Sequence, residues 1–394
     1  MPSTSVAIRL NPFKAHGVEL PILRGASPVP WSPYGYILEE RPQFTLHPLF
    51  HAGVYYVQDS SAMYVGHVFR KILPSLTASS GTQARLRVLD LCAAPGGKTT
   101  DLAASLRTLC GDDFILVSNE VMKDRARVLR DNVARWGDPS VAVTSVDPAV
   151  IGRLLPGFFD VIVADVPCSG EGMFRKDARA VQEWSPEVVE LCTARQKRIL
   201  ADVWPALRED GFLVYSTCTY EESENDGNLE WAATNLGGSI LPPDNEFASS
   251  GVQSTAFGNL LKAGIVPGEG QWVGALRRTS LNEAGARAGD AALDTLHPFR
   301  PGIRKGEWKG NDFVPDPDWA LSICFDREAY PMTAVDKQTA LYYLHRDSII
   351  LPDAPLGYNV ITYKGIPLGF VKNLGKRCNN LLPPARRIMM DVRI

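Results

Sequence analysis

The chain has 394 residues, 45% of them hydrophobic and 22% charged, and this length is enough for two or three domains with their own cores. A formal net charge of -3 excludes a globally basic nucleic-acid-binding protein, so any contact with RNA or DNA has to come from local patches. The seven cysteines are scattered without a C-x-x-C pair, and no apolar run reaches the ~18 residues of a membrane span, so we expect a cytoplasmic protein with reduced thiols and without a metal site.

The first 82 residues are predicted to form a small accessory segment that is not a domain of its own. They are rich in proline, with short extended pieces at 6–10 and 36–38 between turn signals. A helix is expected after residue 60, where one side carries the apolar residues Met63, Val65, Val68, Phe69 and Ile72. Residues 75–82 are predicted to be a polar linker.

Residues 83–278 show the pattern strand, turn, helix, repeated. The predicted strands are 88–91, 114–117, 141–146, 159–164 and 212–216, with a last strand within 268–276. The predicted helices are 98–109, a segment around 128–136, and 195–207. Strands that alternate with helices indicate an α/β fold with a parallel sheet and right-handed crossovers.

Residues 279–290 are small and polar, and we interpret them as a linker. Residues 291–394 are predicted to form a small, mostly β domain, because short strand-like runs occur at 321–325, 358–363 and 367–371.

Polar residues follow the successive strands of the predicted sheet. In parallel sheets the ligand lies beyond the carboxyl ends of the strands. The residues that follow the strands here are Asp90 with a glycine turn, Glu120, Asp147, Asp165 with Cys168, and Cys218. All of them would line one edge of the sheet.

The glycine turn after the first strand consists of Cys92, Ala93, Ala94, Pro95, Gly96, Gly97 and Lys98. It is a poor phosphate-binding P-loop, because Cys92 stands where that motif needs its first glycine. It is not a G-x-G-x-x-G dinucleotide turn either. A proline-glycine-glycine turn at a helix start can instead bring bare backbone close to a ligand that carries an amino acid and a nucleoside.

The acidic residues indicate which ligand this is. Glu120 is placed to accept hydrogen bonds from both ribose hydroxyls, and Asp147 to accept one from an exocyclic amine. Adenosine without a polyphosphate fits this set, which points to S-adenosylmethionine as the cofactor. Any one of these acids can instead be a helix N-cap.

Two of the cysteines, Cys168 and Cys218, end strands beside the expected cofactor. We interpret the other thiols as small buried hydrophobes. A thiolate becomes a strong nucleophile if a positive neighbour lowers its pKa from about 8.5, and the candidate neighbours are Lys98, Arg175 and Lys176. Methylation of a pyrimidine at carbon 5 needs such a nucleophile at carbon 6. Asp165 could stabilise the adduct by sharing a proton with the ring nitrogen.

The sequence resembles the Sun/nucleolar-protein family of RNA cytosine-5 methyltransferases, and most closely its RsmF-like bacterial ribosomal RNA branch. The stretches that carry the resemblance are Ile-Arg-Leu-Asn at 8–11, Tyr-Val-Gln-Asp-Ser-Ser-Ala-Met at 56–63, the glycine turn within 88–99, Asn-Glu at 119–120, the Asp-Val-Pro-Cys loop within 159–177, and Tyr-Ser-Thr-Cys-Thr at 215–219.

The resemblance implies a class I methyltransferase fold, with Cys92 to Lys98, Glu120, Asp147 and Asp165 around S-adenosylmethionine. It implies that Cys218 is the nucleophile and that Cys168 assists breakdown of the covalent enzyme–RNA adduct. Spacing alone leaves these two roles open, since DNA cytosine methyltransferases use the Pro-Cys cysteine. The resemblance also suggests that Arg125 approaches the methionine end of the cofactor. Cys92 departs from the family pattern, in which a smaller residue is usual.

The stretch 365–380 resembles the PUA-type RNA-binding module of the same branch. Nearby basic residues could contact phosphates, or could simply form a solvated face; they are Arg300, Arg304, Lys305, Lys309, Lys372, Lys376, Arg377, Arg386 and Arg387.

The sequence therefore predicts a monomeric enzyme that methylates carbon 5 of a cytosine in RNA, with small-subunit ribosomal RNA, either naked or within the subunit, as the favoured substrate. The target base would be flipped out of its stack. Transfer RNA as the substrate, or a catalytically inactive ribosome assembly factor, are the alternatives. The P-loop spacing argues against an ATPase.

Overall fold

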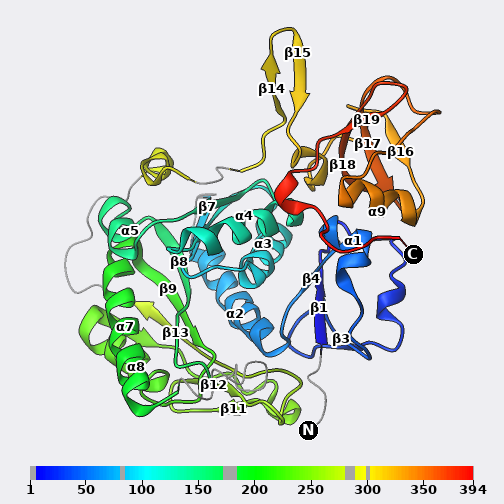
Figure 1. Cartoon of the computed structure of the whole chain (residues 1–394). Helices are drawn as coiled ribbons and strands as arrows, with labels where there is room; N and C mark the ends of the chain where they lie inside the picture. Colours follow the sequence, from blue (N-terminus) through cyan, green and yellow to red (C-terminus); the bar gives the residue numbers. More distant parts are fainter. Residues whose placement is uncertain (1–5, 80–84, 172–183, 280–288, 299–301, 394) are drawn as a thin grey trace.

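A computed structural model describes residues 6–79, 85–171, 184–279, 289–298 and 302–393 of the chain (Figure 1). Its centre is a mixed sheet with the strand order β11-β12-β13-β9-β8-β5-β6-β7, and β10 pairs with β13 beside this path. The strands β5 to β9 are parallel to one another, and β13 is antiparallel to β9. The order reverses between β5 and β8, which is the position where open α/β sheets bind ligands.

The six strands predicted between residues 88 and 276 are all present. Their bounds are β5 Leu86–Asp90, β6 Phe114–Asn119, β7 Val141–Thr144, β8 Phe159–Asp165, β9 Leu207–Thr217 and β13 Gln271–Arg278. The strands β10 Gly238–Ile240, β11 Gln253–Ser254 and β12 Gly258–Leu261 were not predicted. The helices around the sheet are α2 Tyr64–Ser79, α3 Gly97–Cys110, α4 Lys123–Trp136, α5 Pro148–Leu154, α7 Pro186–Val203 and α8 Asp226–Ala232.

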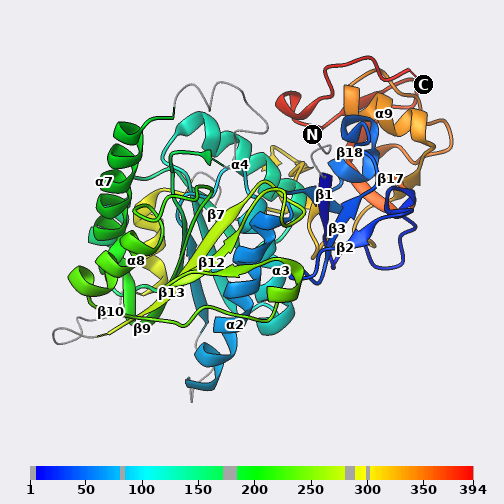
Figure 2. The same cartoon turned by 90° about the horizontal axis from the view of Figure 1, so that it is seen from below.

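The helices cover both faces of the sheet, because successive strand residues point to opposite sides. Val88 packs in one hydrophobic core with α2, α3 and α4, whereas its neighbour Leu89 packs in a second core with α5, α7 and α8. Figure 2 shows α7 and α8 on one side of the strands and α2 and α3 on the other. The result is the expected α/β fold in three layers.

Helix α2 extends further than the sequence predicted. Residues 75–79, expected to be linker, continue the helix beyond Pro74, whose ring lies in its interior. Burial explains this, since Ile72, Leu73 and Leu76 are 4% exposed or less and pack into the core beside the sheet. The gain from that burial outweighs the backbone hydrogen bond that a proline removes.

An antiparallel sheet of four strands precedes α2, with the order β2-β3-β1-β4. Its strands are β1 Val6–Leu10, β2 Ser27–Pro28, β3 Gly35–Leu38 and β4 Tyr55–Val57, and the short helix α1 spans Pro48–His51. In β1, Ala7 packs in the core of the central sheet, whereas Ile8 packs in a core shared with the C-terminal region. This small sheet therefore lies between the two larger parts of the molecule (Figure 1).

The C-terminal region contains a second sheet with the order β16-β17-β18-β19, covered by α9. Its elements are β16 Met332–Ala334, α9 Lys337–His345, β17 Gly357–Tyr363, β18 Ile366–Asn373 and β19 Cys378–Asn380. The strands predicted at 358–363 and 367–371 are thus confirmed. The strand predicted at 321–325 is wrong, because Trp319–Leu321 forms a 3-10 turn and the Ile323 amide donates to the Gly137 carbonyl at the end of α4 instead of pairing in a sheet.

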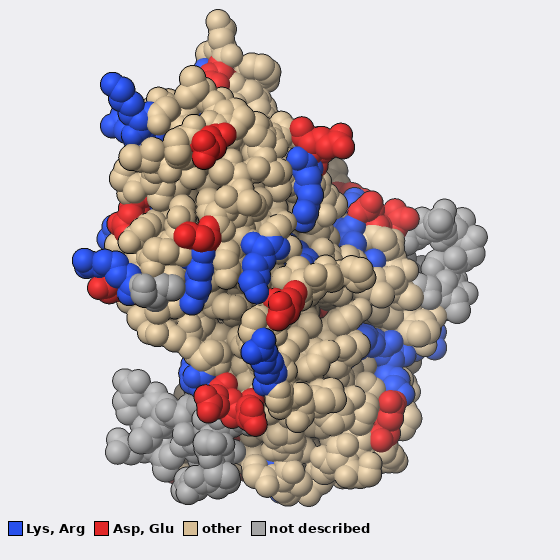
Figure 3. Space-filling view, turned by 90° about the vertical axis from the view of Figure 1, so that its right-hand side faces the viewer, with Lys and Arg blue, Asp and Glu red and all other residues tan. Residues whose placement is uncertain are grey.

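Between the central sheet and this domain, β14 Gly306–Lys309 and β15 Asp312–Pro315 form a two-stranded ribbon that projects from the molecule (Figure 1). Figure 3 views the face on the right of Figure 1, where lysine and arginine side chains alternate with aspartate and glutamate. This mixture agrees with the small net charge and means that phosphate contacts depend on individual basic residues. None of the helices in the described residues is long and apolar enough to cross a bilayer.

Candidate active site

Two thiols meet beyond the carboxyl ends of β8 and β9. Asp165 ends β8 and Cys168 follows it, while Cys218 directly follows β9. Because these parallel strands are neighbours, with Asp165 paired to Ser216, the two loops lie side by side. The sulfur atoms of Cys168 and Cys218 are 3.0 Å apart and share a hydrogen bond, as the sequence predicted for two thiols facing one crevice.

The hydrogen bond shifts the pKa values of the two thiols in opposite directions. It lowers the pKa of Cys218, and the charge of Lys98 acts in the same direction against the opposing effects of burial and Asp165. The same hydrogen bond, followed by burial, raises the pKa of Cys168 well above that of a free thiol. The shared proton is therefore held more tightly by Cys168, and Cys218 is the more acidic of the two thiols.

The Asp165 carboxylate is held by three donors. Lys98 Nζ lies 2.7 Å from Oδ2, while Ser216 Oγ and Gln271 Nε2 lie 2.7 and 3.0 Å from Oδ1. Burial lowers the pKa of Lys98, but the charge and the hydrogen bond of Asp165, together with the charges of Asp90 and Cys218, outweigh burial, so the pKa is raised. The site thus pairs a fixed carboxylate with a fixed ammonium group close to Cys218. Arg175 and Lys176, the other expected cations, lie outside the described residues.

The glycine turn connects β5 to α3. Gly96 has a φ of 113°, a left-handed conformation that favours glycine, and Gly97 begins the helix. The Pro95 carbonyl accepts hydrogen bonds from Asn132 at 2.7 Å and from the Tyr56 hydroxyl at 3.2 Å. The turn is therefore held from both α4 and β4, which fixes the backbone at the start of α3.

Arg9 of β1 supports the same turn from beneath. Its fully buried guanidinium donates to the Gly97 carbonyl at 3.1 Å and to Gln58 Oε1 at 2.9 Å, and it lies 4.8 Å from the centre of the Trp136 ring. Burial lowers the pKa of Arg9, but the residue keeps a partner in Asp101, 3.9 Å away. The hydrogen bond from Arg9 to Gly97 thus connects the Ile-Arg-Leu-Asn stretch at 8–11 to the glycine turn.

Asp90 and Glu120 are buried acids at the ends of β5 and β6. The Asp90 Oδ2 atom accepts a 2.6 Å hydrogen bond from Thr99, and burial raises the pKa of Asp90 to about 7. Glu120 Oε1 accepts from the Met122 amide at 2.9 Å. Two of their oxygens, Asp90 Oδ1 and Glu120 Oε2, have no hydrogen-bond donor among the described residues, although Arg125 lies 3.2 Å from Glu120 Oε2.

Arg125 and Asp147 complete the expected cofactor set. Arg125 donates to the Ala94 carbonyl at 3.0 Å as well as pairing with Glu120, so it bridges the glycine turn and the acid of β6. Asp147 caps α5, since its Oδ1 accepts from the Ala149 amide at 2.9 Å. It is exposed at the same edge of the sheet, so the N-cap and the expected cofactor contact are compatible roles.

Four polar residues of the site had no recognisable signal in the sequence. Gln196 of α7 donates to the Pro167 carbonyl at 3.0 Å and to Glu224 at 2.6 Å, and Glu224 accepts from the Ser169 amide at 3.1 Å. Glu171 accepts from the Tyr220 amide at 2.6 Å. These contacts, together with that of Gln271 to Asp165, fasten the Cys168 loop to the Cys218 loop.

A second loop closes the site from the side of β13. Asp59 Oδ1 accepts from the Glu269 amide at 3.0 Å, and Ser61 Oγ accepts from the Gly270 amide at 3.0 Å. The Tyr220 hydroxyl, two residues after Cys218, donates to the Glu269 carbonyl at 3.2 Å. The Gln-Asp-Ser-Ser stretch at 58–61 therefore positions the loop that carries Gln271.

The remaining cysteines are not part of the pair. Cys92 packs at the edge of the core on the α5 and α7 side, where burial raises its pKa, so the departure from a smaller residue is accommodated. All seven cysteines are free thiols.

Of the basic residues expected to contact phosphates, Arg300 lies outside the described residues.

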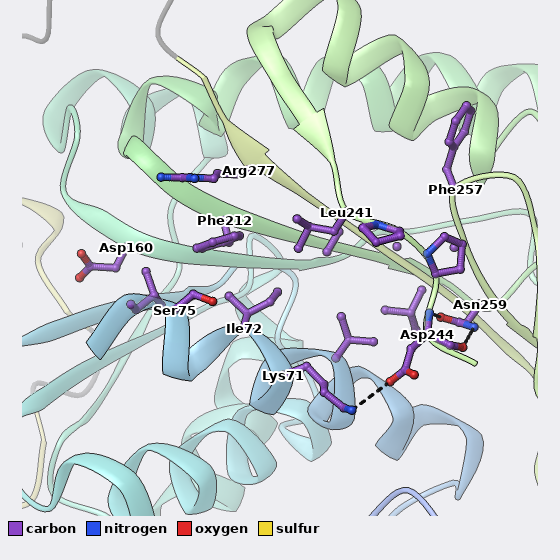
Figure 4. Close-up of a pocket in the computed structure, with 18 of the residues that line it drawn as sticks. Lys71, Ile72, Ser75, Asp160, Phe212, Leu241, Asp244, Phe257, Asn259 and Arg277 are labelled. Atoms are coloured by element: carbon purple, nitrogen blue, oxygen red, sulfur yellow. Dashed lines mark hydrogen bonds and ion pairs between the residues drawn. The ribbon is translucent and has the colours of Figure 1, made fainter. Parts of the chain in front are cut away.

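A cavity of about 830 Å³ lies away from this chemistry, between α2 and the strands β12 and β13 (Figure 4). It is lined by Asp160 near the start of β8 and by Phe212 in the middle of β9, the strands whose carboxyl ends carry Asp165 and Cys218. At its rim His67, Asp244 and Glu246 come close enough to bind a metal, but Lys71 lies 2.5 Å from Glu246 and 3.6 Å from Asp244. The cluster is therefore an ion-pair network.

Three family models match the chain. The model described as 16S rRNA methyltransferase RsmB/F matches residues 81–237, the N-terminal domain of 16S rRNA methyltransferase RsmF matches residues 2–60, and the methyltransferase RsmF PUA domain matches residues 331–388. The order and the spacing of these matches follow the three parts of the structure.

Known proteins show the same relationship. Ribosomal RNA small subunit methyltransferase F of Escherichia coli O157:H7 is 35% identical over 427 residues, which cover 93% of this chain and 85% of that protein. A methyltransferase homolog protein from Pyrococcus horikoshii is 25% identical, with a TM-score of 0.52 over 70% of this chain and 87% of its own. NSun6 of the same organism, solved with SFG, shares the fold at 17% identity, with a TM-score of 0.54 and coverage of 70% and 91%.

The parallel sheet with antiparallel β13, together with the glycine turn and the acids at the strand ends, defines a class I methyltransferase, whose cofactor is S-adenosylmethionine. The residues fit that cofactor, since a ribose offers hydroxyl donors for the unsatisfied oxygen of Glu120. Within this class, the chain belongs to the ribosomal RNA small subunit methyltransferase F family.

Proposed function

We propose that this chain methylates carbon 5 of a cytosine in small-subunit ribosomal RNA through a covalent bond between Cys218 and carbon 6 of the base. The single observation that carries the proposal is the pair of thiols 3.0 Å apart, with the pKa of Cys218 lowered by the hydrogen bond from Cys168. Carbon 5 of a cytosine reacts with a methyl donor only after a nucleophile has added to carbon 6. A thiolate meets that need.

Bound S-adenosylmethionine would supply the electrophilic methyl group, held by the glycine turn, Glu120 and Asp147. Cys218 forms a sulfur–carbon bond to carbon 6, and the electron pair of the double bond moves onto carbon 5. Asp165, oriented by Lys98, Ser216 and Gln271, stabilises this adduct by accepting a hydrogen bond from the ring nitrogen, which takes its proton from water.

Cys168 acts in the release of the product. While Cys218 is bonded to carbon 6, it is no longer a charged acceptor, so the main reason for the high pKa of Cys168 disappears. Cys168 can then lose its proton to water and take the proton of carbon 5. The carbon 5–carbon 6 double bond re-forms, and the Cys218 thiolate leaves.

RNA that contains 5-fluorocytosine tests these roles, because the fluorine at carbon 5 cannot leave as a proton does. The wild-type chain should form a covalent complex that survives denaturing electrophoresis, and Cys218→Ala should form none. With unmodified RNA, Cys168→Ala should accumulate the adduct. Cys324→Ala, which removes an exposed thiol, is the matched control and should behave as the wild type.

If Cys218→Ala still traps the RNA and Cys168→Ala does not, the assignment of the nucleophile is wrong. Absence of S-adenosylmethionine binding in calorimetry would support the inactive assembly factor instead. The division of the chain at residues 82, 278 and 290, its cytoplasmic location and its monomeric state stay predictions.

A further inference from the structure

The ribbon of β14 and β15 lies outside the residues that the family models match, 2–60, 81–237 and 331–388. It projects from the body of the molecule beside the C-terminal domain (Figure 1). Its function is therefore not covered by the family's domains and has to be inferred from its own residues.

The ribbon has one aromatic face and one charged face. Trp308 and Phe313 are directly paired across the two strands, and their rings meet edge to face with centroids 5.4 Å apart. Because neighbouring residues of a strand point to opposite sides, Glu307, Lys309 and Asp312 lie on the other face. Trp308 is 72% exposed, so its ring is open to contact with a ligand.

The charged face anchors the ribbon to the C-terminal sheet. Asp312 Oδ2 lies 2.5 Å from Lys372 Nζ and accepts a 3.3 Å hydrogen bond from the Tyr358 hydroxyl, so β15 contacts β17 and β18. Lys372 also lies 4.8 Å from the centre of the Tyr358 ring. Since Asp312 faces the domain, the Trp308 side of the ribbon faces solvent.

Exposed basic residues precede the ribbon. Arg304 and Lys305 make no ion pair within the described part of the chain, although the Lys305 ammonium lies 5.5 Å from the centre of the Trp319 ring. Glu307 is neutralised by Lys309, 2.9 Å away. Exposed Lys376 and Arg377 follow β18, the strand to which Asp312 is anchored. An exposed aromatic ring among uncompensated cations is how proteins bind unpaired nucleotides, because every base can stack and every phosphate is negative.

We propose that β14 and β15 form an RNA-binding arm, in which an unpaired base of the substrate stacks on Trp308 while Arg304 and Lys305 contact the adjoining phosphates. The inference rests on the proposed function only in taking RNA as the substrate. It adds a contact beyond the catalytic domain that would help to select which RNA segment reaches Cys218.

The test compares Trp308→Ala, Trp308→Leu and Trp308→Phe in the full-length chain. Leucine can still pack on Phe313 but cannot stack with a base, whereas phenylalanine does both. We expect the alanine and leucine variants to weaken binding to transcribed small-subunit rRNA by about 5- to 150-fold, the range for one stacked base, and the phenylalanine variant to stay close to wild type. In turnover, the KM for RNA should rise while kcat and the KM for S-adenosylmethionine stay unchanged.

Because Trp308 is exposed and contributes little to folding, the melting temperatures of its variants should match that of the wild type. The double variant Arg304→Gln with Lys305→Gln should reduce the salt dependence of RNA binding. Equal RNA affinity of Trp308→Leu and the wild type would overturn the proposal. The proposal would also be overturned if Trp308→Leu lost affinity for intact subunits but lost none for naked rRNA, because that would indicate a ribosomal protein as the partner. If neither the wild type nor any variant transfers methyl groups, but Trp308→Leu binds RNA more weakly than the wild type does, the RNA-binding arm stands and the proposed reaction fails.

Discussion

The lowered pKa of Cys218, which follows β9, depends on groups at the ends of two other strands, β5 and β8. Cys168 donates the hydrogen bond that lowers the pKa of Cys218, and Lys98 adds a positive charge. Lys98 is itself held in place by Asp165. A lysine at the start of α3 therefore belongs to the glycine turn and also lowers the pKa of Cys218.

Replacing Lys98 should change the pH dependence of the reaction. In Lys98→Gln the charge that helps to lower the pKa of Cys218 is lost, so the pKa of that thiol rises and a smaller fraction is thiolate at neutral pH. The acid limb of kcat/KM should move to higher pH, and the loss of activity should be larger at pH 7 than at pH 9. Lys98→Arg keeps the charge and should keep the wild-type limb. An unchanged limb in Lys98→Gln would remove Lys98 from this role.

Asp90 should make the protein less stable as the pH rises. Burial raises its folded-state pKa to about 7, above the 3.8 of an unfolded chain, so the folded state holds a proton that the unfolded state has lost in between. The contribution of protonated Asp90 to the free energy of unfolding is fully present below pH 4 and is lost as the pH rises through 7. Asp90→Asn has no carboxyl group to titrate at this position, so it avoids this loss. The free energy of unfolding of the variant minus that of the wild type should therefore be up to about 4 kcal/mol larger at pH 8 than at pH 4.

Urea unfolding of the wild type and Asp90→Asn at several pH values measures that difference. Parallel curves for Asp90→Asn and the wild type would mean that Asp90 is ionised in the folded protein at neutral pH.

At the scale of the elements, the turn before α3 shows how a backbone conformation serves the cofactor. A Cβ atom at Gly96 would lie 3.2 Å from Leu129 Cδ1, in a backbone conformation that other residues rarely adopt. At Gly97 the nearest atom would be Gln58 Cδ, at an ordinary 3.4 Å, in helical backbone. The two adjacent glycines are therefore not equivalent.

Gly96→Ala should cost about 1–3 kcal/mol of stability and weaken S-adenosylmethionine binding, because the strained residue shifts the turn. Gly97→Ala should change stability by less than about 1 kcal/mol in either direction, since alanine suits a helix. Thermal unfolding of both variants, together with calorimetric titration of the cofactor into Gly96→Ala, makes the comparison. Equal stability losses would show that the left-handed conformation of Gly96 is not the reason for the glycine.

The sequence was sufficient to predict those site residues that follow strands. Asp90, Asp165 and Cys218 follow apolar strands in an alternating α/β pattern, and parallel strands bring their carboxyl ends to one edge. Gln196, Glu224 and Gln271 could not be predicted, because they reach the loops from α7, a turn and an antiparallel strand, where nothing in the local pattern marks an inward polar residue. Arg9 was noticed only through the resemblance, since burial of a single arginine leaves no periodic signal.

At the scale of the whole molecule, the small N-terminal sheet joins the other two parts. Alternation along β1 sends Ala7 into the core of the central sheet and Ile8 into the core that contains Leu341 and Leu344 of α9. The C-terminal region also contacts α4 directly, since the Ile323 amide bonds to the Gly137 carbonyl. A side chain at Gly137 would meet the Leu321 carbonyl, so that approach requires glycine. We therefore expect the three parts to unfold together.

Arg386 is the residue through which this coupling can be tested. Near the C-terminus it pairs with Asp131 of α4, 3.3 Å away, and with Asp318, 2.5 Å away, and its side chain is only 10% exposed. Burial would lower its pKa, but the charges of Asp318 and Asp131 outweigh burial and raise it.

Arg386→Met leaves two partly buried carboxylates without this cation and should cost about 3 kcal/mol of unfolding free energy, because breaking such a network leaves uncompensated charge. It should also split the calorimetric transition, with the C-terminal region melting first, because its ion pair with α4 is lost, which leaves the Ile323 contact with the end of α4 beside the shared core. Arg387→Met, next to it but exposed, should change neither quantity by more than about 0.5 kcal/mol. A single, equally cooperative transition in Arg386→Met would show that the shared core around Ile8 couples the domains by itself.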